Sequence, residues 1–434
     1  MKQNHEVIFS DTTNGIGLAV EEIFEHYGGV GSLLKPSKDV YIKVNGVDLK
    51  KYAYTSPDVL REVILYLQKN GANDIYVIEN ATQGNITRLV FMVTGMAEVC
   101  KQTGAIPVYL DETDAVPVYL EGLKSFINLS SFVYERLIEQ SDQNLYISLP
   151  KLKTHSMSQI TLSVKNQFGL VHHESRIADH NFNLHQKFAD IYRILRPNFV
   201  IIDGLIATNH GHYIAEKNTD ECIVPMNCLI GGKDPLATDV IGASFLGFDI
   251  TDVTHLMLSQ KAGISPVDMT NIKIINQQLF NDRKKNLTCD LLEKFPPELT
   301  ILRGRTRCCK EGCRRNTETV AEIFYCDHNG KGDFTILMGK GIDPALVNKI
   351  DHPPVHIAGG CAIQDFGLEM QRRFGKKNVT FSNGCNNLPA TIYALCKHMH
   401  VNPIKLSATN PLRALAALTS AKLHGSKAII PPLL

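Results

Sequence analysis

Residues 150–155 read Pro-Lys-Leu-Lys-Thr-His, and they directly follow an apolar run, Leu-Tyr-Ile-Ser-Leu, at 145–149. Short apolar runs of this kind are typical of strands buried on both faces of a sheet. The polar residues therefore follow the carboxyl end of a predicted strand. A helical segment with Lys-Asn-Gln-Phe-Gly at 165–169 is expected to bring a third lysine close to them. Cations and hydroxyls gathered at strand ends indicate an anion site in an α/β protein. The alternative is a solvated basic turn, since turn and surface lysines are common.

Strands and helices alternate through the first two-thirds of the sequence. Two of the predicted helices begin with a capping residue followed by proline, Ser56-Pro57 and Asp234-Pro235. The predicted strands are 6–10, 39–44, 74–78, 105–110, 145–149, 198–202 and 272–275, and the predicted helices are 15–27, 56–69, 85–104, 184–195, 235–246 and 251–262. This alternation predicts an α/β fold with mostly parallel sheets and flanking helices, Rossmann-like in its β-α-β units.

A second α/β unit follows a polar segment. Residues 277–300 contain a Lys-Lys and a Pro-Pro pair, and three further strands are predicted at 334–338, 355–358 and 379–381. We therefore predict a two-lobed protein with a cleft between its lobes. The predicted parts are an α/β domain at 1–277, a connector at 278–305 and a smaller cysteine-rich α/β domain at 306–434.

The motif Pro-Lys-Leu-Lys-Thr-His followed by Lys-Asn-x-x-Gly resembles the signature of the domain-of-unknown-function family 362. Two later segments agree with it, Ile-Ile-Asp-Gly at 201–204 and Gly-Gly-Lys-Asp-Pro-Leu-Ala-Thr-Asp at 231–239. The early Ile-Lys-Pro-Asn segment of that family corresponds to residues 42–45, where Val44 replaces proline. The resemblance covers about residues 38–250. It implies a fold and a site but no reaction, and the ferredoxin-type insert of some members is absent because no Cys-x-x-Cys-x-x-Cys run occurs.

Lys153, His155 and Lys165 are the predicted catalytic residues. Lysine at a strand end can neutralise a carboxylate or phosphate, and it can act as a base or tether a cofactor if burial lowers its pKa. Histidine transfers protons near neutral pH. The predicted ligand-binding residues are Lys43, Asn45, Lys151, Thr154, Asn166, Asp203 and Asp239. Glu79, His180, His210 and His212 are further candidates for the lining of the site.

Seven of the eleven cysteines fall between residues 308 and 396. Cys361 and Cys385 each follow a glycine after a predicted strand, and a Cys-Cys-x-x-x-Cys cluster lies upstream. Grouped thiolates can bind an iron–sulfur cluster or zinc, although this spacing is not typical of either. The predicted metal ligands are Cys308, Cys309, Cys313, Cys361 and Cys385. The alternative is a set of buried thiols beside arginines on a solvated face.

Composition narrows the class of protein. The net charge is +1, from 45 basic and 44 acidic residues, which argues against a nucleic-acid partner. No apolar run reaches the roughly 18 residues of a membrane span, and the first six residues lack the apolar core of a signal peptide. We therefore predict a cytoplasmic protein without a membrane partner.

Three functional hypotheses remain open. The first is a metal- or iron–sulfur-dependent redox enzyme that binds a small anionic molecule in the cleft and exchanges electrons with a partner protein. The second is a non-redox isomerase with a lysine and histidine site, for which the analogy with nickel-pincer lactate racemases concerns architecture alone. The third is a non-catalytic cofactor- or metal-binding protein. A homo-oligomer is compatible with each of them.

Overall fold

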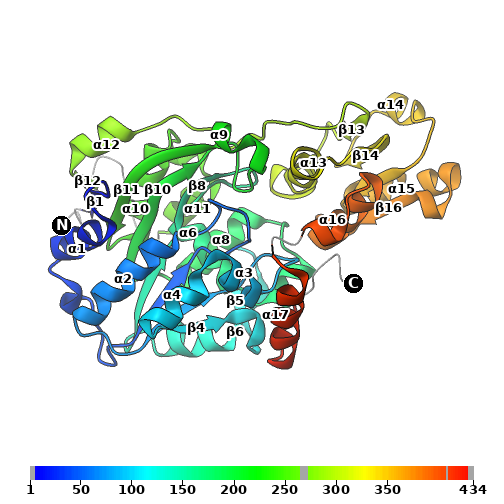
Figure 1. Ribbon diagram of the computed structural model, residues 1–434. Coiled ribbons are helices and arrows are strands. Elements are labelled where there is room, and N and C mark those ends of the chain that lie inside the picture. The colour runs from blue at the N-terminus through cyan, green and yellow to red at the C-terminus, as the bar shows by residue number, and fades with distance from the viewer. Residues whose placement is uncertain (1–4, 264–271, 407–408, 429–434) are drawn as a thin grey trace.

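The computed structural model describes residues 5–263, 272–406 and 409–428 (Figure 1). Residues 1–4 lie outside the described residues. They belong to the N-terminal segment that lacks the apolar core of a signal peptide. Within these ranges, no helix is long and apolar enough to cross a membrane.

A ten-stranded sheet organises the larger unit. Its strands are β1 (His5–Asp11), β2 (Val40–Val44), β3 (Ile75–Glu79), β4 (Ile106–Tyr109), β7 (Leu145–Leu149), β8 (Lys151–His155), β9 (Gln159–Thr161), β10 (Phe199–Thr208), β11 (Ile223–Gly232) and β12 (Ile272–Ile275). The main order is β12-β1-β11-β10-β7-β2-β3-β4, with β8 beside β10 and β9 beside β8. Among the described strands of this sheet, the antiparallel pairs are β11 with its two neighbours and β9 with β8. The predicted α/β class with mostly parallel sheets is confirmed.

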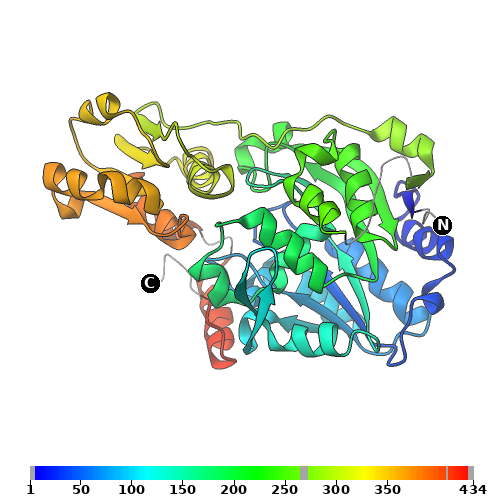
Figure 2. The ribbon, with the colours of Figure 1, turned by 180° about the vertical axis from the view of Figure 1, so that it is seen from behind.

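Helices cover both faces of this sheet (Figures 1 and 2). The longer ones are α1 (Ile16–His26), α2 (Pro57–Lys69), α3 (Thr87–Thr94), α4 (Met96–Thr103), α8 (Leu184–Ile194), α10 (Pro235–Phe245) and α11 (Thr254–Lys261). Apolar side chains of α1, α2 and α4 form a core on one face, and those of α10 and α11 form a core on the other. Burial on both faces explains why the central strands are almost wholly apolar.

Local capping explains where several helices begin. The Ser56 side chain accepts a hydrogen bond from the Asp58 amide at the start of α2. Asp234 accepts hydrogen bonds from two amides at the start of α10. The prediction of one helix over 85–104 is wrong, because Gly95 adopts a φ of 87° and separates α3 from α4.

The segment that follows Leu149 is a strand and not a turn. After Pro150 the chain continues as β8, which pairs in parallel with the later half of β10, while β7 pairs with its earlier half. A short antiparallel return, β9, leads into α6 (Ser163–Asn166) and α7 (His173–Ala178). Residues 151–155 therefore form a paired strand and not a free turn. In a strand, successive side chains point to opposite faces, so the directions of these side chains are fixed.

A four-stranded parallel sheet organises the second unit. It runs in the order β13 (Leu299–Arg303), β14 (Phe334–Met338), β15 (Val355–Ala358) and β16 (Val379–Ser382). Its helices are α13 (Arg315–His328), α14 (Pro344–Asn348), α15 (Gly360–Phe374) and α16 (Leu388–His398). The three strands predicted here are thus joined by a fourth, β13, from the segment predicted to be a connector.

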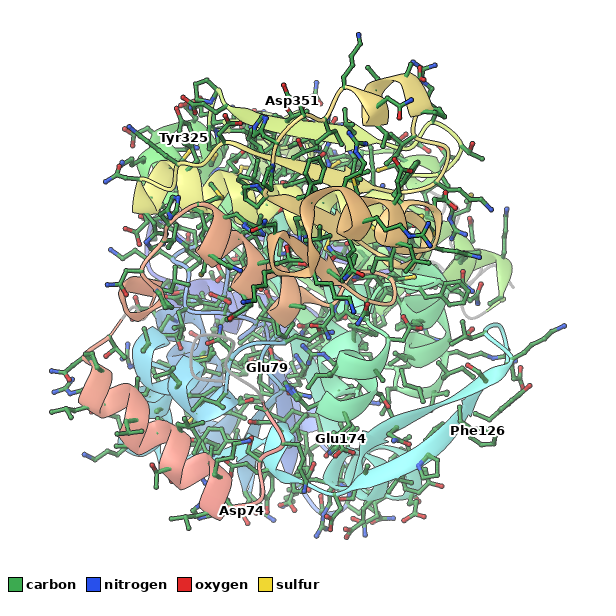
Figure 3. All side chains as sticks on the ribbon, turned by 90° about the vertical axis from the view of Figure 1, so that its right-hand side faces the viewer. Asp74, Glu79, Phe126, Glu174, Tyr325 and Asp351 are labelled. Carbon is green, nitrogen blue, oxygen red and sulfur yellow. The ribbon has the colours of Figure 1, made fainter. Side chains whose placement is uncertain are left out.

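Three shorter features complete the fold. A hairpin of β5 (Ala115–Leu120) and β6 (Ser125–Ser130) projects from the larger unit, with Phe126 on it (Figure 3). The predicted connector also includes part of α12 (Gln277–Arg283). The last helix, α17 (Pro411–Leu423), returns to the larger unit and packs against α3 through Leu89 and Ala421 (Figure 1). The domain boundaries at 277 and 305 remain a prediction.

Candidate functional site

A cavity lies at the carboxyl edge of the large sheet, where this sheet meets the second unit. Residues of β2, β3, β8, α6, α7 and α8 line it, and α13 and α16 contribute Asn316 and Leu388. Figure 3 shows Glu79, the last residue of β3, inside the molecule below the helices of the second unit. The three residues predicted to be catalytic, Lys153, His155 and Lys165, all line this cavity.

Cations outnumber carboxylates in the wall of the cavity. Its lining includes four cationic side chains, Lys43, Lys153, Lys165 and Arg176, and one carboxylate, Glu79. Lys43, Lys153, Arg176 and Glu79 are each at most 4% exposed. The Arg176 guanidinium donates to two backbone carbonyls at 2.8 and 2.9 Å, and no carboxylate of the described residues lies within ion-pair distance of it. The cavity wall therefore contains more buried basic side chains than carboxylates.

The Glu79 carboxylate is fully occupied. Lys43 Nζ lies 2.6 Å from Glu79 Oε1, which also accepts from the Asn80 amide, and the Gly46 amide donates to Oε2 at 2.5 Å. Gly169, the last residue of the Lys-Asn-x-x-Gly motif, lies against this pair. A Cβ atom at Gly169 would approach Glu79 Oε1 to 2.5 Å and Lys43 Nζ to 2.7 Å, so the motif requires glycine for steric reasons.

Lys153 is almost completely buried and donates a hydrogen bond to the Ala53 carbonyl. Burial lowers the pKa of Lys153 well below its ordinary value, and the positive charges of Lys165 and Lys151 lower it further. An anion in the cavity would reverse this effect, because it would favour the charged amine.

Lys165 differs from the other lysines of the cavity. Its Nζ makes no hydrogen bond or ion pair with any described residue, and it lies 5.3 Å from the centre of the Phe188 ring. Burial lowers the pKa of Lys165 to about 7, with the nearby charges of Arg176 and Lys43 acting in the same direction. The Lys165 amine thus has no hydrogen-bond or ion-pair partner among the described residues, and about half of it is neutral near pH 7.

His155 is held in one tautomer. Its Nδ1 accepts a hydrogen bond from the Met157 amide at 3.2 Å, so the proton of the neutral ring is on Nε2. The ring stacks on His212 with centroids 3.5 Å apart. Burial and the neighbouring His212 and Lys165 lower the pKa of His155 well below its ordinary value. At neutral pH this histidine is therefore a hydrogen-bond donor and not a base.

His180 has the opposite arrangement. Its Nδ1 donates to Asn181 Oδ1 at 2.6 Å, which leaves a lone pair on Nε2. Burial lowers its pKa to about 3, with Arg176 adding to the effect. The Asn181 side chain then donates to the backbone carbonyls of Cys385 and Asn386. A wall residue of the cavity is thus connected directly to the cysteine-bearing edge of the second unit.

Asn166 connects α6 to β2. Its Oδ1 accepts from Lys43 Nζ and Asn45 Nδ2, and its Nδ2 donates to the Lys43 carbonyl and to Ser148 Oγ. Asn45 Oδ1 is buried, and no described residue forms a hydrogen bond with it. Of the residues predicted to bind ligand, Lys43, Asn45 and Asn166 line the cavity.

Lys151 and Asp203 lie outside the lining of the cavity and form an ion pair, with Lys151 Nζ 3.0 Å from Asp203 Oδ2. The same carboxylate accepts from the Ser56 and Leu205 amides. Thr154 Oγ1 accepts from the Gly211 amide at 3.0 Å. These three residues hold neighbouring segments together and lie outside the lining of the cavity, so their role in ligand binding stays a prediction.

Asp239 also lies outside the lining and supports α6. Its two carboxylate oxygens accept hydrogen bonds from the Ser163 and Val164 amides at 2.8 and 2.7 Å. These are the first two residues of α6, the helix that carries Lys165. Asp239 is therefore a positioning residue for the cavity lysine.

The five predicted metal ligands converge at the carboxyl edge of the small sheet. All eleven cysteines lie in the described ranges and are free thiols. Burial raises the pKa of Cys313 to about 12, and the other four thiols, Cys308, Cys385, Cys309 and Cys361, act on it in the same direction. A Cβ atom at Gly359 would lie 2.2 Å from Cys313 Sγ, and Arg307 Nε lies 3.1 Å from Cys309 Sγ. Even so, no three His, Cys, Asp or Glu side chains in the described ranges are arranged to hold a metal ion.

Arg176 and Tyr213 are cavity residues that sequence reasoning did not find. Arg176 follows the His-His-Glu-Ser stretch at 172–175, where nothing in the local pattern separates it from a surface arginine. His212 and His180 line the cavity as predicted, whereas His210 lies outside the lining and bonds to the Asp290 carbonyl.

The fold and the cavity together define a two-unit α/β protein with a buried, cation-lined site at the ends of parallel strands. Residues 40–244 match the profile of the family described as "Domain of unknown function (DUF362)". The matched segment includes every cavity lysine and histidine named above. The five clustered cysteines lie beyond it.

A curated relative adds a second similarity. A thylakoid-associated protein of Synechocystis sp. is 24% identical to the chain over 260 residues, which cover 57% of this chain and 75% of that protein.

Proposed function

We propose that this protein is an enzyme that binds a small, multiply charged anion in the cation-lined cavity. The observation that carries the proposal is the basic lining of the cavity, in which four lysine and arginine side chains, three of them buried, stand against one carboxylate. Removing cations from water is costly unless an opposite charge compensates them. Arg176 cannot lose its charge by deprotonation in the physiological range, so a bound anion is the physical means of balancing it.

The other lining residues restrict the ligand. Amide side chains such as Asn45, Asn80 and Gln83 offer hydrogen bonds, while Phe168, Phe188 and Met157 offer apolar surface. This combination suits an organic carboxylate or phosphate with a short carbon skeleton, because polar groups fix orientation and apolar walls enclose the remainder.

Two histidines provide complementary proton chemistry. His155 presents an Nε2–H donor, and His180 presents an Nε2 lone pair. Because both histidines line the cavity, a ligand there has access to one donor and one acceptor, as proton movement within a substrate requires. This pairing supports the non-redox isomerase hypothesis over a passive binding protein.

The proposal is tested by measuring the thermal stabilisation of the purified full-length chain by sulfate, phosphate, lactate, malate and citrate. An anion that binds the folded state raises its melting temperature. The variant Lys153→Met removes one cavity cation and should weaken anion binding by roughly tenfold, about 1.4 kcal/mol. The exposed residue Lys101 provides the matched control, Lys101→Met, which should bind as the unmodified protein does. Equal affinities for both variants would contradict the proposal.

A thiolate-bound metal or iron–sulfur cluster is a second candidate feature, and it would make the enzyme a redox catalyst. Its support is the convergence of five cysteines at an edge that contacts the cavity wall through Asn181. The thiols would have to reorient to coordinate one ion, because they are not arranged as a ligand group now. Anaerobic purification with iron, zinc, nickel and acid-labile sulfide assays tests this candidate. Iron with sulfide supports it, whereas a metal-free protein with full activity refutes it.

For location we propose the cytoplasm, on the basis of sequence composition. The thylakoid association of the relative gives the alternative of attachment to a membrane face. Co-sedimentation with anionic liposomes separates the two, since a cytoplasmic protein stays in the supernatant.

A further inference from the structure

Each lysine of the site except Lys165 has a partner that restrains its amine. Lys43 is paired with Glu79, and Lys153 donates to the Ala53 carbonyl. Lys151, which lies outside the lining of the cavity, is paired with Asp203. Lys165 Nζ has no such partner among the described residues, and it lies 5.3 Å from the centre of the Phe188 ring. The Lys165 amine is therefore free to approach a molecule in the cavity.

The surroundings of Lys165 favour its neutral, nucleophilic form. Burial and the charges of Arg176 and Lys43 lower its pKa to about 7, so a large fraction of the amine has a lone pair at neutral pH. Lys153 is also depressed, but it is only 1% exposed and already bonded. Among the described lysines of this cavity, Lys165 alone combines an accessible amine with a large neutral fraction at neutral pH.

The cations beside Lys165 can hold the charged part of a ligand while its reactive carbon faces the amine. Arg176 has no carboxylate partner in the described part of the chain, and its Nε is buried there without a hydrogen bond. Among the described residues, the Nε2–H of His155 has no protein acceptor, so it can donate to a carbonyl oxygen. Donors of this kind polarise a carbonyl group toward nucleophilic attack.

We infer that Lys165 forms a reversible imine with an aldehyde or ketone that carries a carboxylate or phosphate group. The inference rests on the proposed anion-binding function and specifies the substrate class of the same cavity. It separates Lys165, which bonds covalently, from Arg176, which holds the anionic group.

The step balances without any further reactant. The neutral amine of Lys165 attacks the carbonyl carbon, a C–N bond forms, and the carbonyl π electrons move to oxygen. The two amine hydrogens leave with that oxygen as water, and a C=N bond results. Nothing is oxidised or reduced, and water reverses the reaction.

The experiment is borohydride trapping on the full-length protein. Two probes are used, pyruvate as an anionic ketone and pyridoxal 5′-phosphate as an anionic aldehyde. After reduction, intact mass and peptide mapping should show one adduct per chain on Lys165, which forms faster as the pH rises through about 7. Sulfate should slow the labelling, because it competes for the same cations. Lys165→Arg should lose the adduct, and Lys101→Met should keep it.

Three results would overturn the inference: labelling spread evenly over exposed lysines, labelling that persists at the same rate in Lys165→Arg, or labelling by uncharged acetone as fast as by pyruvate. Circular dichroism of Lys165→Arg confirms its folding, and Lys165→Met serves as a second variant. If sulfate and lactate stabilise the protein but no adduct forms, the inference fails while anion binding stands. If pyruvate labels Lys165 without protection by sulfate, the proposed anion site fails instead.

Discussion

At the scale of the residue, Lys165 shows how burial without a partner changes the chemistry of a side chain. The same amine on a surface would stay protonated, whereas here burial and two neighbouring cations favour its neutral form. Gly169 matters because it has no side chain. A Cβ atom at this position would lie too close to the Lys43–Glu79 pair. Both residues belong to the Lys-Asn-x-x-Gly motif.

The charge of Lys165 predicts a pH-dependent stability in the absence of anions. Below pH 7 both the folded and the unfolded chain keep the proton, so the folded state bears the full cost of a buried charge. Between about 7 and about 10.4 the unfolded chain binds more protons, so the free energy of unfolding rises with pH. Lys165→Met should therefore stabilise the protein by roughly 1–3 kcal/mol at pH 6 and by less at pH 9.

Urea unfolding at both pH values, with Lys101→Met as the control, measures this difference. A loss of stability in Lys165→Met at pH 6 would show that the buried charge is compensated within the protein.

At the scale of the element, the short helix α6 depends on a side chain from another helix. Asp239 of α10 accepts the first two amides of α6, whereas the predicted role of Asp239 was ligand binding. Asp239→Asn keeps one acceptor and loses the other, so we expect a loss of about 1 kcal/mol in stability and weaker anion binding as Lys165 shifts. Asp234→Asn is the matched control, because Asp234 caps α10 itself.

Anion titration of both variants by thermal shift provides the measurement. The prediction is wrong if Asp234→Asn lowers the affinity as much as Asp239→Asn does.

At the scale of the whole molecule, the second unit is attached beside the mouth of the cavity. Asp327 of α13 accepts from Lys50 Nζ at 2.7 Å and from the Glu216 and Lys217 amides at 3.0 and 3.2 Å. Burial raises the pKa of Asp327, but the hydrogen bond and charge of Lys50 outweigh it, so the net pKa is lowered. The contact is thus present at neutral pH and is lost only as the pH falls through this lowered value.

Asp327→Asn should loosen the loops at 46–56 and 209–218, which contribute Val47 and Tyr213 to the cavity. We expect faster hydrogen exchange in both loops, weaker anion binding and a change of at most about 1 kcal/mol in global stability. Asp333→Asn is the control, since Asp333 is exposed on the same unit and pairs with His352 away from the cavity. Unchanged exchange in both loops would refute this role.

The sequence by itself determined the α/β class, most element positions and the grouping of Lys153, His155 and Lys165. Apolar runs, helical spacing and caps such as Ser56-Pro57 act over a few residues, so they can be read locally. The same local rules missed the break at Gly95, since an isolated glycine within a helical pattern is often tolerated.

Only the tertiary structure decided which charges are paired and which are free. Lys151 and Lys165 look alike in the sequence, yet Lys151 meets Asp203 across the sheet while Lys165 meets no partner among the described residues. Arg176 lines the cavity, although the sequence around it has no pattern that distinguishes it from a surface arginine. The physical reason is that ion pairing and desolvation depend on through-space neighbours, which strand order and helix packing bring together from distant parts of the chain.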